Sequence, residues 1–336
     1  MNSTASPTDR YLKVLEKHWG YTEFRGIQRD IIESIGAGRD TLGLMPTGGG
    51  KSITFQVPAM VLPGVCVVVT PLIALMKDQV AGLRKRHIRA AALHAGLGHE
   101  EILTILDNCV FGHYKFLYVS PERLSSEIFM AKFRHMEVSF VTIDEAHCIS
   151  QWGHDFRPAY LQIAELREVK PDCPVLALTA TATPEVARDI QHVLRFRQEN
   201  VFRMSFYRSN LAYQVLWADF SLQSLRRVLE ADNGSCIIYR RSRQQCEDLS
   251  KVLNQWGFTS TFFHAGLSHP EKDKRQTLWV QDKVRIMVAT SAFGMGIDKA
   301  DVRLVVHLDI PDSIEEYFQE AGRAGRDGLP ARSIII

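Results

Sequence analysis

The stretch Met45-Pro46-Thr47-Gly48-Gly49-Gly50-Lys51-Ser52 places three consecutive glycines directly before a lysine and a serine. Glycine permits positive φ and a close approach of the backbone, so successive N–H groups of such a loop can point at phosphate oxygens. A helix that begins near Lys51 adds the positive end of its dipole. We therefore predict a polyphosphate-binding loop, in which Lys51 reaches the β- and γ-phosphates and the Ser52 hydroxyl ligates Mg²⁺.

This loop departs from the general phosphate-loop pattern at its first position. The pattern has glycine where Met45 stands. The alternative is a glycine-rich turn without a ligand, but such a turn does not require lysine and serine to follow at once. Nucleotide binding is therefore the preferred interpretation. The residues predicted to contact the phosphates are Thr47, Gly48, Gly49, Gly50, Lys51 and Ser52.

The composition is that of an ordinary globular chain. It has 336 residues, of which 46% are hydrophobic and 23% charged, and this length predicts two domains. The formal net charge is only +2, so any site for a polyanion must be a local patch. Six cysteines without C-x-x-C spacing argue against a zinc site within the chain and against a disulfide framework. Residues 1–10 lack the apolar region of a secretory signal, and we expect a cytoplasmic location.

The stretch from Ile53 to Met76 carries no charge and is long enough to span a bilayer. Three prolines and a glycine interrupt it, and Val65 to Val69 is rich in β-branched residues. We therefore predict a buried helix followed by a central strand, and no contact with a membrane.

Short apolar stretches alternate with helical ones in the first part of the chain. Each is almost continuously apolar, as expected for parallel strands covered on both faces. Polar residues follow each stretch, and ligands bind at this edge of open α/β sheets. We predict an α/β fold with a mostly parallel sheet flanked by helices. The predicted strands are Thr41–Met45, Cys66–Thr70, Phe116–Ser120, Phe140–Asp144 and Val175–Thr179.

The fourth predicted strand runs into two adjacent carboxylates, Asp144 and Glu145. Asp144 can hold Mg²⁺, directly or through water, and Glu145 can orient and deprotonate an attacking water. A lone Asp-Glu pair after a strand is most often a surface feature. Because a phosphate-binding loop lies upstream, we interpret this pair as the second half of a nucleotide site.

Upstream of the loop, Tyr21, Arg25 and Gln28 offer a stacking face, a charge and an amide that can read an adenine edge. The alternative is that Tyr21 and Phe24 simply hold two helices together. These residues alone favour that structural interpretation.

The strand–helix alternation lapses between Glu199 and Asn210, and we predict domains 1–205 and 206–336. The tetrapeptide His94–Leu97 recurs as His264–Leu267, which indicates an internal duplication. The second half has no Gly-Lys-Ser sequence, so we expect that it binds no nucleotide by itself. Its predicted strands are Cys236–Tyr239, Ser260–His264, Arg285–Ala289 and Leu304–Leu308.

The second half contributes the glycine-rich stretch Gln319–Gly328, in which Arg323 and Arg326 are three residues apart. We predict that the two arginines lie on one helical face. Across an interdomain cleft they would stabilise charge on the transferring γ-phosphoryl group, with Gln319 also at the nucleotide. The alternative is a basic helix end with a glycine-rich stop.

Together these motifs resemble superfamily-two helicases, and specifically the RecQ family of DNA helicases. The resemblance runs in family order from Leu15 to the end of the chain, and its most specific segments are Asp144–Pro158 and Phe293–Lys299. These two lie within the matching segments Asp144–Tyr160 and Ala289–Arg303, and the others are Gly20–Gln28, Met45–Ser52, Thr70–Gln79, Ser120–Leu124, Ala177–Thr183, Tyr239–Arg243 and Gln319–Gly328.

The resemblance implies two RecA-like P-loop domains and an ATP-dependent 3′–5′ DNA helicase that acts in recombination and repair. ATP and Mg²⁺ are the implied cofactors, and single-stranded and partly duplex DNA the implied partner. It assigns Tyr21, Arg25 and Gln28 to adenine. We expect a monomer, and the sequence specifies no protein partner.

In this family the loop after Asp-Glu-Ala-His is an aromatic-rich sensor of single-stranded DNA, here Trp152, His154, Phe156, Arg157 and Tyr160. Aromatic stacking contributes roughly 1–3 kcal/mol per base with any sequence. Core packing is the alternative for Trp152 and Phe156. Further hydroxyls and arginines are expected to bind the DNA backbone without reading bases. They are Thr70, Ser120, Arg123, Ser242, Arg243 and Thr290.

Some features depart from the family. Ser205–Asn210 replaces Ser-Phe-Asp-Arg-Pro-Asn, and Arg240 stands where cysteine is usual. The sequence stops at Ile336, where zinc-binding and winged-helix modules usually follow, so we expect a shortened form. A DNA-stimulated ATPase or translocase with little unwinding is therefore the alternative function. An RNA-directed helicase and a non-hydrolysing, nucleotide-gated DNA clamp are further alternatives.

Overall fold

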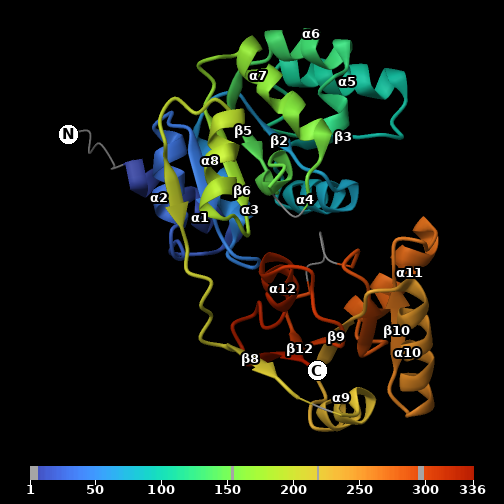
Figure 1. Cartoon of the computed structure of the whole chain (residues 1–336). Helices are drawn as coiled ribbons and strands as arrows, with labels where there is room; N and C mark the ends of the chain where they lie inside the picture. The colour runs from blue at the N-terminus through green and yellow to red at the C-terminus, as the bar shows by residue number, and fades with distance from the viewer. Residues whose placement is uncertain (1–6, 153–154, 218, 294–298) are drawn as a thin grey trace. The chain divides into compact units, whose positions relative to one another are not determined.

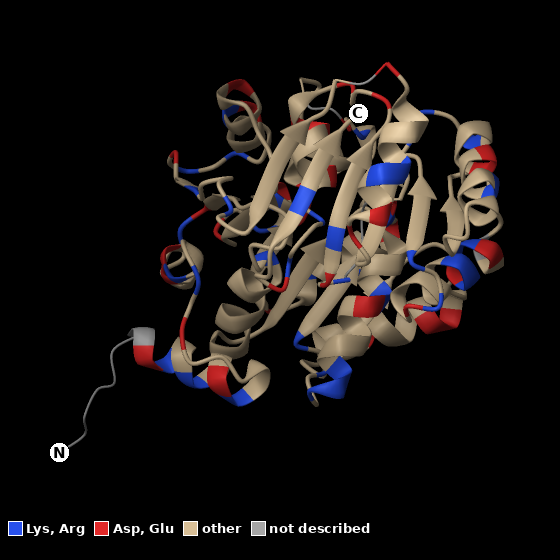
Figure 2. Cartoon of the chain, turned by 90° about the horizontal axis from the view of Figure 1, so that it is seen from below, with Lys and Arg blue, Asp and Glu red and all other residues tan. Residues whose placement is uncertain are grey.

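The computed structural model describes residues 7–152, 155–217, 219–293 and 299–336. The chain divides into two compact units, Met1–Phe206 and Tyr207–Ile336. Each unit is a parallel sheet flanked by helices, so the predicted α/β fold is confirmed (Figure 1). Charged residues of both signs are scattered over the helices (Figure 2).

Among the described residues, the sheet of the first unit has seven parallel strands in the order β3-β4-β2-β5-β6-β1-β7. The five predicted strands all form, within about two residues of their predicted ends. The strands are β1 (Thr41–Leu44), β2 (Val65–Val69), β3 (Ala90–Leu93), β4 (Phe116–Val119), β5 (Val138–Ile143), β6 (Val175–Thr179) and β7 (Val201–Arg203). The helices are α1 (Pro7–Trp19), α2 (Gln28–Gly36), α3 (Lys51–Val61), α4 (Ile73–Lys85), α5 (His99–Val110), α6 (Glu127–His135), α7 (Ile163–Val169) and α8 (Pro184–Val193). The short 3₁₀ helices are η1 (Pro121–Arg123), η2 (Ala146–Ile149) and η3 (Pro158–Gln162).

Two apolar layers cover this sheet, because successive strand side chains point to opposite faces. In β2, Val65, Val67 and Val69 pack with α5, α6, α7 and α8. Cys66 and Val68 of the same strand pack with α2, α3 and α4 on the other face. All five residues of β2 are buried, which places it at the centre of the unit.

The uncharged stretch from Ile53 to Met76 becomes most of α3, all of β2 and the start of α4. Pro58 lies inside α3. In the described part of the chain no helix is both long and apolar enough to cross a membrane.

The second unit repeats the sheet order of the first. Its described strands run β10-β11-β9-β12-β13-β8, which is the order of β3-β4-β2-β5-β6-β1 with each strand replaced by its counterpart. This supports the duplication inferred from the repeated tetrapeptide, which follows β3 and β10. The strands are β8 (Leu211–Val215), β9 (Ser235–Tyr239), β10 (Ser260–Phe263), β11 (Ile286–Ala289), β12 (Val302–His307) and β13 (Ala331–Ile335), and the helices are α9 (Ser221–Glu230), α10 (Arg243–Gln255), α11 (His269–Val280) and α12 (Ile314–Ala321).

One buried ion-pair network joins distant parts of the first unit. Asp40, just before β1, accepts two hydrogen bonds from Arg167 at 2.9 and 3.0 Å and one from Arg197 Nε at 3.0 Å. The backbone N–H groups of Val175 and Arg197 donate to the same carboxylate. Burial alone raises the pKa of Asp40, but these hydrogen bonds outweigh it and hold the pKa below its usual value.

Replacing Asp40 by asparagine should lower the free energy of unfolding by about 3 kcal/mol, because the charge of buried Arg167 is then uncompensated. Arg197→Ala is the matched control, since that side chain is 45% exposed and its loss should be much less destabilising. Thermal and urea unfolding of both variants measure the difference. Equal effects would contradict this role for the Asp40–Arg167 pair.

Candidate nucleotide and nucleic-acid site

The glycine-rich loop connects β1 to α3, as predicted. Gly48 and Gly50 have φ of 82° and 78°, a conformation that favours glycine. Gly50 precedes the first turn of α3, so Lys51 is the first helical residue. Met45 is fully buried in the apolar layer beneath α2, α3 and α4. The side chain that breaks the sequence pattern therefore fixes the start of the loop in the core.

Gln28 lies directly against this loop. Its Nε2 atom donates to the Gly49 and Gly50 carbonyl oxygens at 3.3 and 3.2 Å, and its Oε1 atom accepts from the Arg25 N–H at 2.9 Å. A Cβ atom on Gly50 would collide with the Gln28 amide. The Arg25 guanidinium lies 5.5 Å from the centre of the Tyr21 ring, which is 49% exposed. The structure thus brings this trio beside the loop, and its role at adenine stays a prediction.

The carboxylate pair at the end of β5 also lies at the loop. Lys51 Nζ is 3.4 Å from Glu145 Oε1, and both side chains are more than four-fifths buried. Burial and repulsion by Glu145 raise the pKa of Asp144 to about 6, while Lys51 and the neighbouring Thr70 hydroxyl oppose that shift. A buried carboxylate pair with one lysine lacks positive charge, and this fits the predicted binding of a divalent cation by Asp144 and Ser52.

Glu145 is held in an unusual backbone conformation. Its φ of 50° is left-handed, which is rare for a residue with a side chain. His147, which the sequence analysis gave no role, is buried beside it. His147 Nδ1 lies 3.5 Å from Glu145 Oε2 and 2.8 Å from the Thr179 hydroxyl at the end of β6. His147 therefore links Glu145 to the end of β6.

The aromatic-rich loop follows these carboxylates directly. Trp152 is 80% exposed, so a core role is excluded for it, while Phe156 is half-buried. Arg157 donates to Asp155 Oδ2 from Nη2 at 2.9 Å and from Nε at 3.2 Å. His154 lies outside the described residues.

Tyr160 corrects one expectation. It is fully buried, so it does not offer a stacking face to DNA. Its hydroxyl donates to the Asp144 carbonyl oxygen at 3.0 Å. Tyr160 thereby ties the far end of the aromatic-rich loop to the backbone of a predicted Mg²⁺ ligand.

His147, Cys148 and Asp155 lie close enough together to offer three metal ligands. Each already has a protein partner: Thr179 for His147, Asp155 for Cys148, and Arg157 for Asp155. These contacts account for the cluster as part of the loop's packing. The expectation that the chain holds no zinc stays a prediction.

The predicted DNA contacts of the first unit lie at the carboxyl edge of its sheet. Thr70 and Ser120 follow β2 and β4, but only 1% and 3% of their surfaces are exposed. Arg123, in η1, donates from Nη2 to the His94 carbonyl oxygen at 3.2 Å. Their contact with DNA stays a prediction.

In the second unit, Arg323 and Arg326 are not on a helix. α12 ends at Ala321 and Gly322 caps it, so the prediction of one shared helical face is wrong. Both arginines lie in the turns that follow. Burial raises the pKa of the Tyr239 hydroxyl, and the nearby charges of Arg323 and Arg326 oppose that shift. Tyr239 is the last residue of β9, so the arginines lie at the carboxyl edge of this sheet.

Two residues that the sequence analysis did not assign hold this arginine-bearing turn. Arg208 donates to the Gly322 and Gly325 carbonyl oxygens, and Asn210 donates to those of Gly325 and Leu329 at 2.8 Å. Gly325 has a φ of 60°, and a Cβ atom there would lie 2.6 Å from Asn210 Nδ2. Arg208 and Asn210 are two of the four positions of the Ser205–Asn210 segment that match the family pattern, the others being Ser205 and Phe206, and this match was an available signal.

The remaining predicted DNA contacts of this unit are accessible or half-buried. Ser242 caps α10 by accepting from the Gln245 N–H at 3.1 Å. Arg243 is exposed and packs against Gly266, and Thr290 follows β11. Arg240, which replaces the family's cysteine, pairs with Asp309 at 3.1 Å. Of the specific segment Phe293–Lys299, residues 294–298 lie outside the described residues.

Comparisons with known proteins agree with this architecture. The family DEAD/DEAH box helicase matches residues 25–190, and the family Helicase conserved C-terminal domain matches residues 221–328. The ATP-dependent DNA helicase RecQ of Pasteurella multocida is 42% identical over 97% of this chain. The chain belongs to the RecQ family.

Other RecQ-family relatives match along the same length. The probable ATP-dependent DNA helicase RecS of Bacillus subtilis is 40% identical over 96% of this chain and 66% of its own. The match to the Pasteurella protein covers 52% of that protein, so the chain spans about half the length of several curated relatives.

Solved structures show the same fold at low identity. The helicase Lhr of Mycobacterium smegmatis, bound to single-stranded DNA and AMP-PNP, has a TM-score of 0.75 at 20% identity, over 98% of this chain and 47% of that chain. Dbp5 of S. cerevisiae, bound to RNA and ADP BeF3, has a TM-score of 0.74 at 15% identity, over 99% of this chain and 87% of that chain. Such likeness establishes the fold that this RecQ-family chain shares with helicase cores.

The raised pKa of Asp144 predicts a pH-dependent stability difference. The folded carboxyl group holds a proton up to about pH 6, whereas the unfolded group releases it near 3.8. Protonation therefore favours the folded state, and this contribution is lost as pH rises through about 6. Without nucleotide or Mg²⁺, Asp144→Asn should be more stable than wild type by about 2 kcal/mol at pH 8. That advantage should vanish by about pH 4.

Thermal unfolding of both proteins across this pH range provides the measurement. Asp155→Asn is the control, because Arg157 holds the pKa of Asp155 below its usual value against the effect of burial. That variant should lose stability at pH 8. A stability difference for Asp144→Asn that does not change with pH would contradict the assignment.

Proposed function

We propose that this chain is the motor core of an ATP-dependent 3′–5′ DNA helicase, coupling ATP hydrolysis to movement along single-stranded DNA and to unwinding. The observation that carries the proposal is the buried Asp144–Glu145 pair. It faces Lys51 of the phosphate-binding loop on one side, and Tyr160 joins it to the aromatic-rich loop on the other. Family membership supports it, since the matching relatives are named as ATP-dependent DNA helicases.

We propose that Lys51 changes its partner when ATP binds. In the structure, Lys51 pairs with Glu145. When Lys51 moves to the β- and γ-phosphates, Glu145 is released to orient and deprotonate the attacking water. Ser52 and Asp144 would hold Mg²⁺, which neutralises phosphate charge when bound. Gln28, with Tyr21 and Arg25, is proposed to select adenine.

Arg323 and Arg326 are proposed to stabilise charge on the transferring γ-phosphoryl group, with Gln319 contacting the nucleotide. The clamp formed by Arg208 and Asn210 supports this proposal, because it fixes the turn that carries both arginines. A guanidinium held in place in advance loses less freedom when it binds a phosphate.

DNA sensing is proposed to act through the aromatic-rich loop. Exposed Trp152 and half-buried Phe156 offer stacking faces, and Arg157 can exchange Asp155 for a phosphate. The Tyr160 hydroxyl donates to the backbone of Asp144. A movement of this loop would therefore shift Asp144 at the ATP site directly.

Glu145→Gln should lower the rate of ATP hydrolysis about 100-fold or more, because glutamine keeps the shape but cannot accept the proton from water. ATP affinity should change little, and a fluorescent nucleotide analogue can measure it. A hydrolysis rate close to that of wild type would favour a nucleotide-gated clamp and overturn the proposal.

Phe156→Ala should remove most of the stimulation of hydrolysis by single-stranded DNA, because it deletes one stacking contact of roughly 1–3 kcal/mol. Phe111→Ala is a matched control, since Phe111 is exposed at the end of α5, far along the chain from the loop. ATPase rates with DNA and with RNA of equal length provide the measurement, beside strand displacement from a partly duplex substrate. Equal stimulation by RNA would favour the RNA-directed alternative, and stimulation without displacement the translocase.

A further inference from the structure

One stretch of the first unit is far more basic than the chain as a whole. From Gln79 to His99 there is no carboxylate, while Arg84, Lys85, Arg86 and Arg89 carry four positive charges. That exceeds the net charge of +2 of the whole chain, in which charges are otherwise mixed (Figure 2). All four side chains are exposed. Within the described part of the chain, no ion pair joins them to a carboxylate. We call them the Arg84–Arg89 cluster.

The cluster lies at the amino edge of the sheet, away from the predicted single-strand contacts. α4 has 13 residues, so its end is about 20 Å from the Thr70 edge. His87, with φ of 60°, lets the chain turn, and the Ile88 N–H donates to the Leu83 carbonyl oxygen at 3.0 Å. Cations in the last helical turn offset the helix dipole, but Arg86 and Arg89 lie beyond that turn and need another account.

A second element adds to the same surface. The ring of His18, at the end of α1, lies next to the backbone of Arg86. This contact brings the last turn of α1, with exposed Lys17, beside the cluster. Two segments far apart in the sequence therefore place positive charge together.

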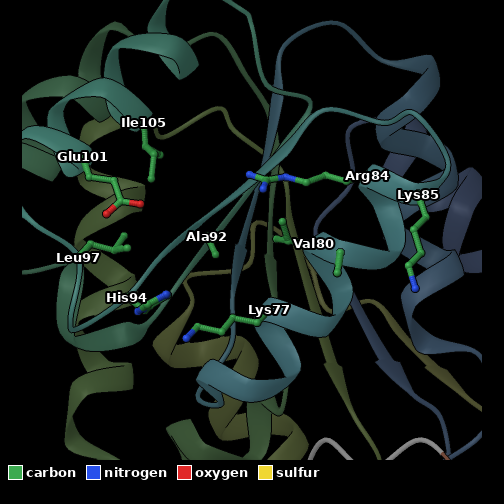
Figure 3. A pocket seen from close by; sticks show the side chains of 10 residues that line it. Lys77, Val80, Arg84, Lys85, Ala92, His94, Leu97, Glu101 and Ile105 are labelled. Atoms are coloured by element: carbon green, nitrogen blue, oxygen red, sulfur yellow. The ribbon is translucent and has the colours of Figure 1, made fainter.

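A groove of about 600 Å³ connects the cluster to the opposite edge of the sheet. Its α4 wall carries Lys77, Arg84 and Lys85, and Lys77 and His94 point toward one another at one end (Figure 3). The carboxylate in its lining is Glu101, on the α5 side. The other lining residues are Val80, Ala81, Ala92, Leu97 and Ile105.

The end of the groove at His94 meets a predicted DNA contact. The His94 carbonyl oxygen accepts the hydrogen bond from Arg123. Arg123 and Lys77 therefore lie near the His94 end of the groove, while Arg84 and Lys85 line it toward the end of α4.

The chemistry of this surface fits a phosphodiester backbone. Among the described residues the groove lining holds no Phe, Tyr or Trp, whereas its Lys and Arg side chains can bind phosphates without reading sequence. Duplex DNA carries about one negative charge per 1.7 Å, so several separated cations on one surface can each meet a phosphate. We propose that the groove and the Arg84–Arg89 cluster bind DNA phosphates beyond the aromatic-rich loop, an inference that rests on the proposed DNA helicase function.

The test removes two exposed cations whose side chains do not contribute to the core of the unit. Lys85 and Arg89 are exposed, and their side chains make no hydrogen bond among the described contacts, unlike Arg84 and Arg86. In fluorescence anisotropy, Lys85→Ala/Arg89→Ala should weaken binding of a duplex of roughly 30 base pairs at least about tenfold at low salt. The slope of log affinity against log salt should fall by about 2.

A control variant and two single-stranded probes make the result specific. Arg227→Ala/Lys283→Ala removes two exposed cations from the equivalent edge of the second unit, one in the last turn of α9 and one after α11, and should bind as wild type does. A single strand of about 30 nucleotides and one of about 8 distinguish the source of the phosphates. If the variant loses affinity for the duplex alone, the surface binds duplex DNA. Loss on the longer strand but not the shorter assigns it to the extended single strand.

Unchanged affinity and salt slope for all three probes would overturn the inference, as would an equal loss in the control. Tighter binding of poly-glutamate than of DNA to wild type, lost in the Lys85/Arg89 variant, would reassign the surface to an acidic protein and overturn it too. If the helicase proposal itself fails, wild-type hydrolysis shows no stimulation by any of the DNA probes. If only this inference fails, wild type is stimulated and the variant binds as wild type does.

Discussion

Two adjacent carboxylates buried at the end of one strand need positive charge, and much of the first unit is arranged around that need. Burying charge is unfavourable unless a partner offsets it. Lys51 offsets part of it, which brings the phosphate-binding loop to β5, and the raised pKa of Asp144 shows that the compensation is incomplete. The carboxylate pair therefore retains an excess of negative charge, which is the condition that the proposed Mg²⁺ site requires.

Other residues that we assign to the site also follow individual strands at this carboxyl edge. β2 and β4 lead to the hydroxyls of Thr70 and Ser120, and β6 leads to Thr179, which holds His147. Parallel strands make this possible because all their carboxyl ends meet at one edge. The second unit repeats the strand order and places Arg323 and Arg326 beside the end of β9. The two units therefore present different residues at the equivalent edge, a carboxylate pair in the first and two arginines in the second.

Local sequence patterns predicted the central strands and the phosphate-binding loop because those features depend on neighbouring residues. β2 consists of four valines and one cysteine, all buried, and such a sequence suits a central strand better than a helix. β3 was harder to predict, since its sequence Ala-Ala-Ala-Leu has no strand preference and forms at the edge through pairing with β4.

Contacts between distant residues could not be read from spacing. Asp40 depends on Arg167 and Arg197, 127 and 157 residues away. The clamp by Arg208 reaches 114 residues along the chain to Gly322. The three-residue spacing of Arg323 and Arg326 predicted a helix. Gly322 ends that helix, and only the structure shows the turns that carry the two arginines. Tyr160 looked like a DNA contact because aromatic type does not reveal which way a ring faces.

Met45 has a consequence for the energetics of nucleotide capture. A glycine at that position would leave the entrance of the loop free to sample many backbone conformations, and binding would have to suppress them. The buried methionine removes that freedom when the chain folds. Part of the conformational entropy that the loop would lose on binding a triphosphate is therefore lost on folding instead. The affinity for the triphosphate then depends on packing in the apolar layer beneath α2, α3 and α4.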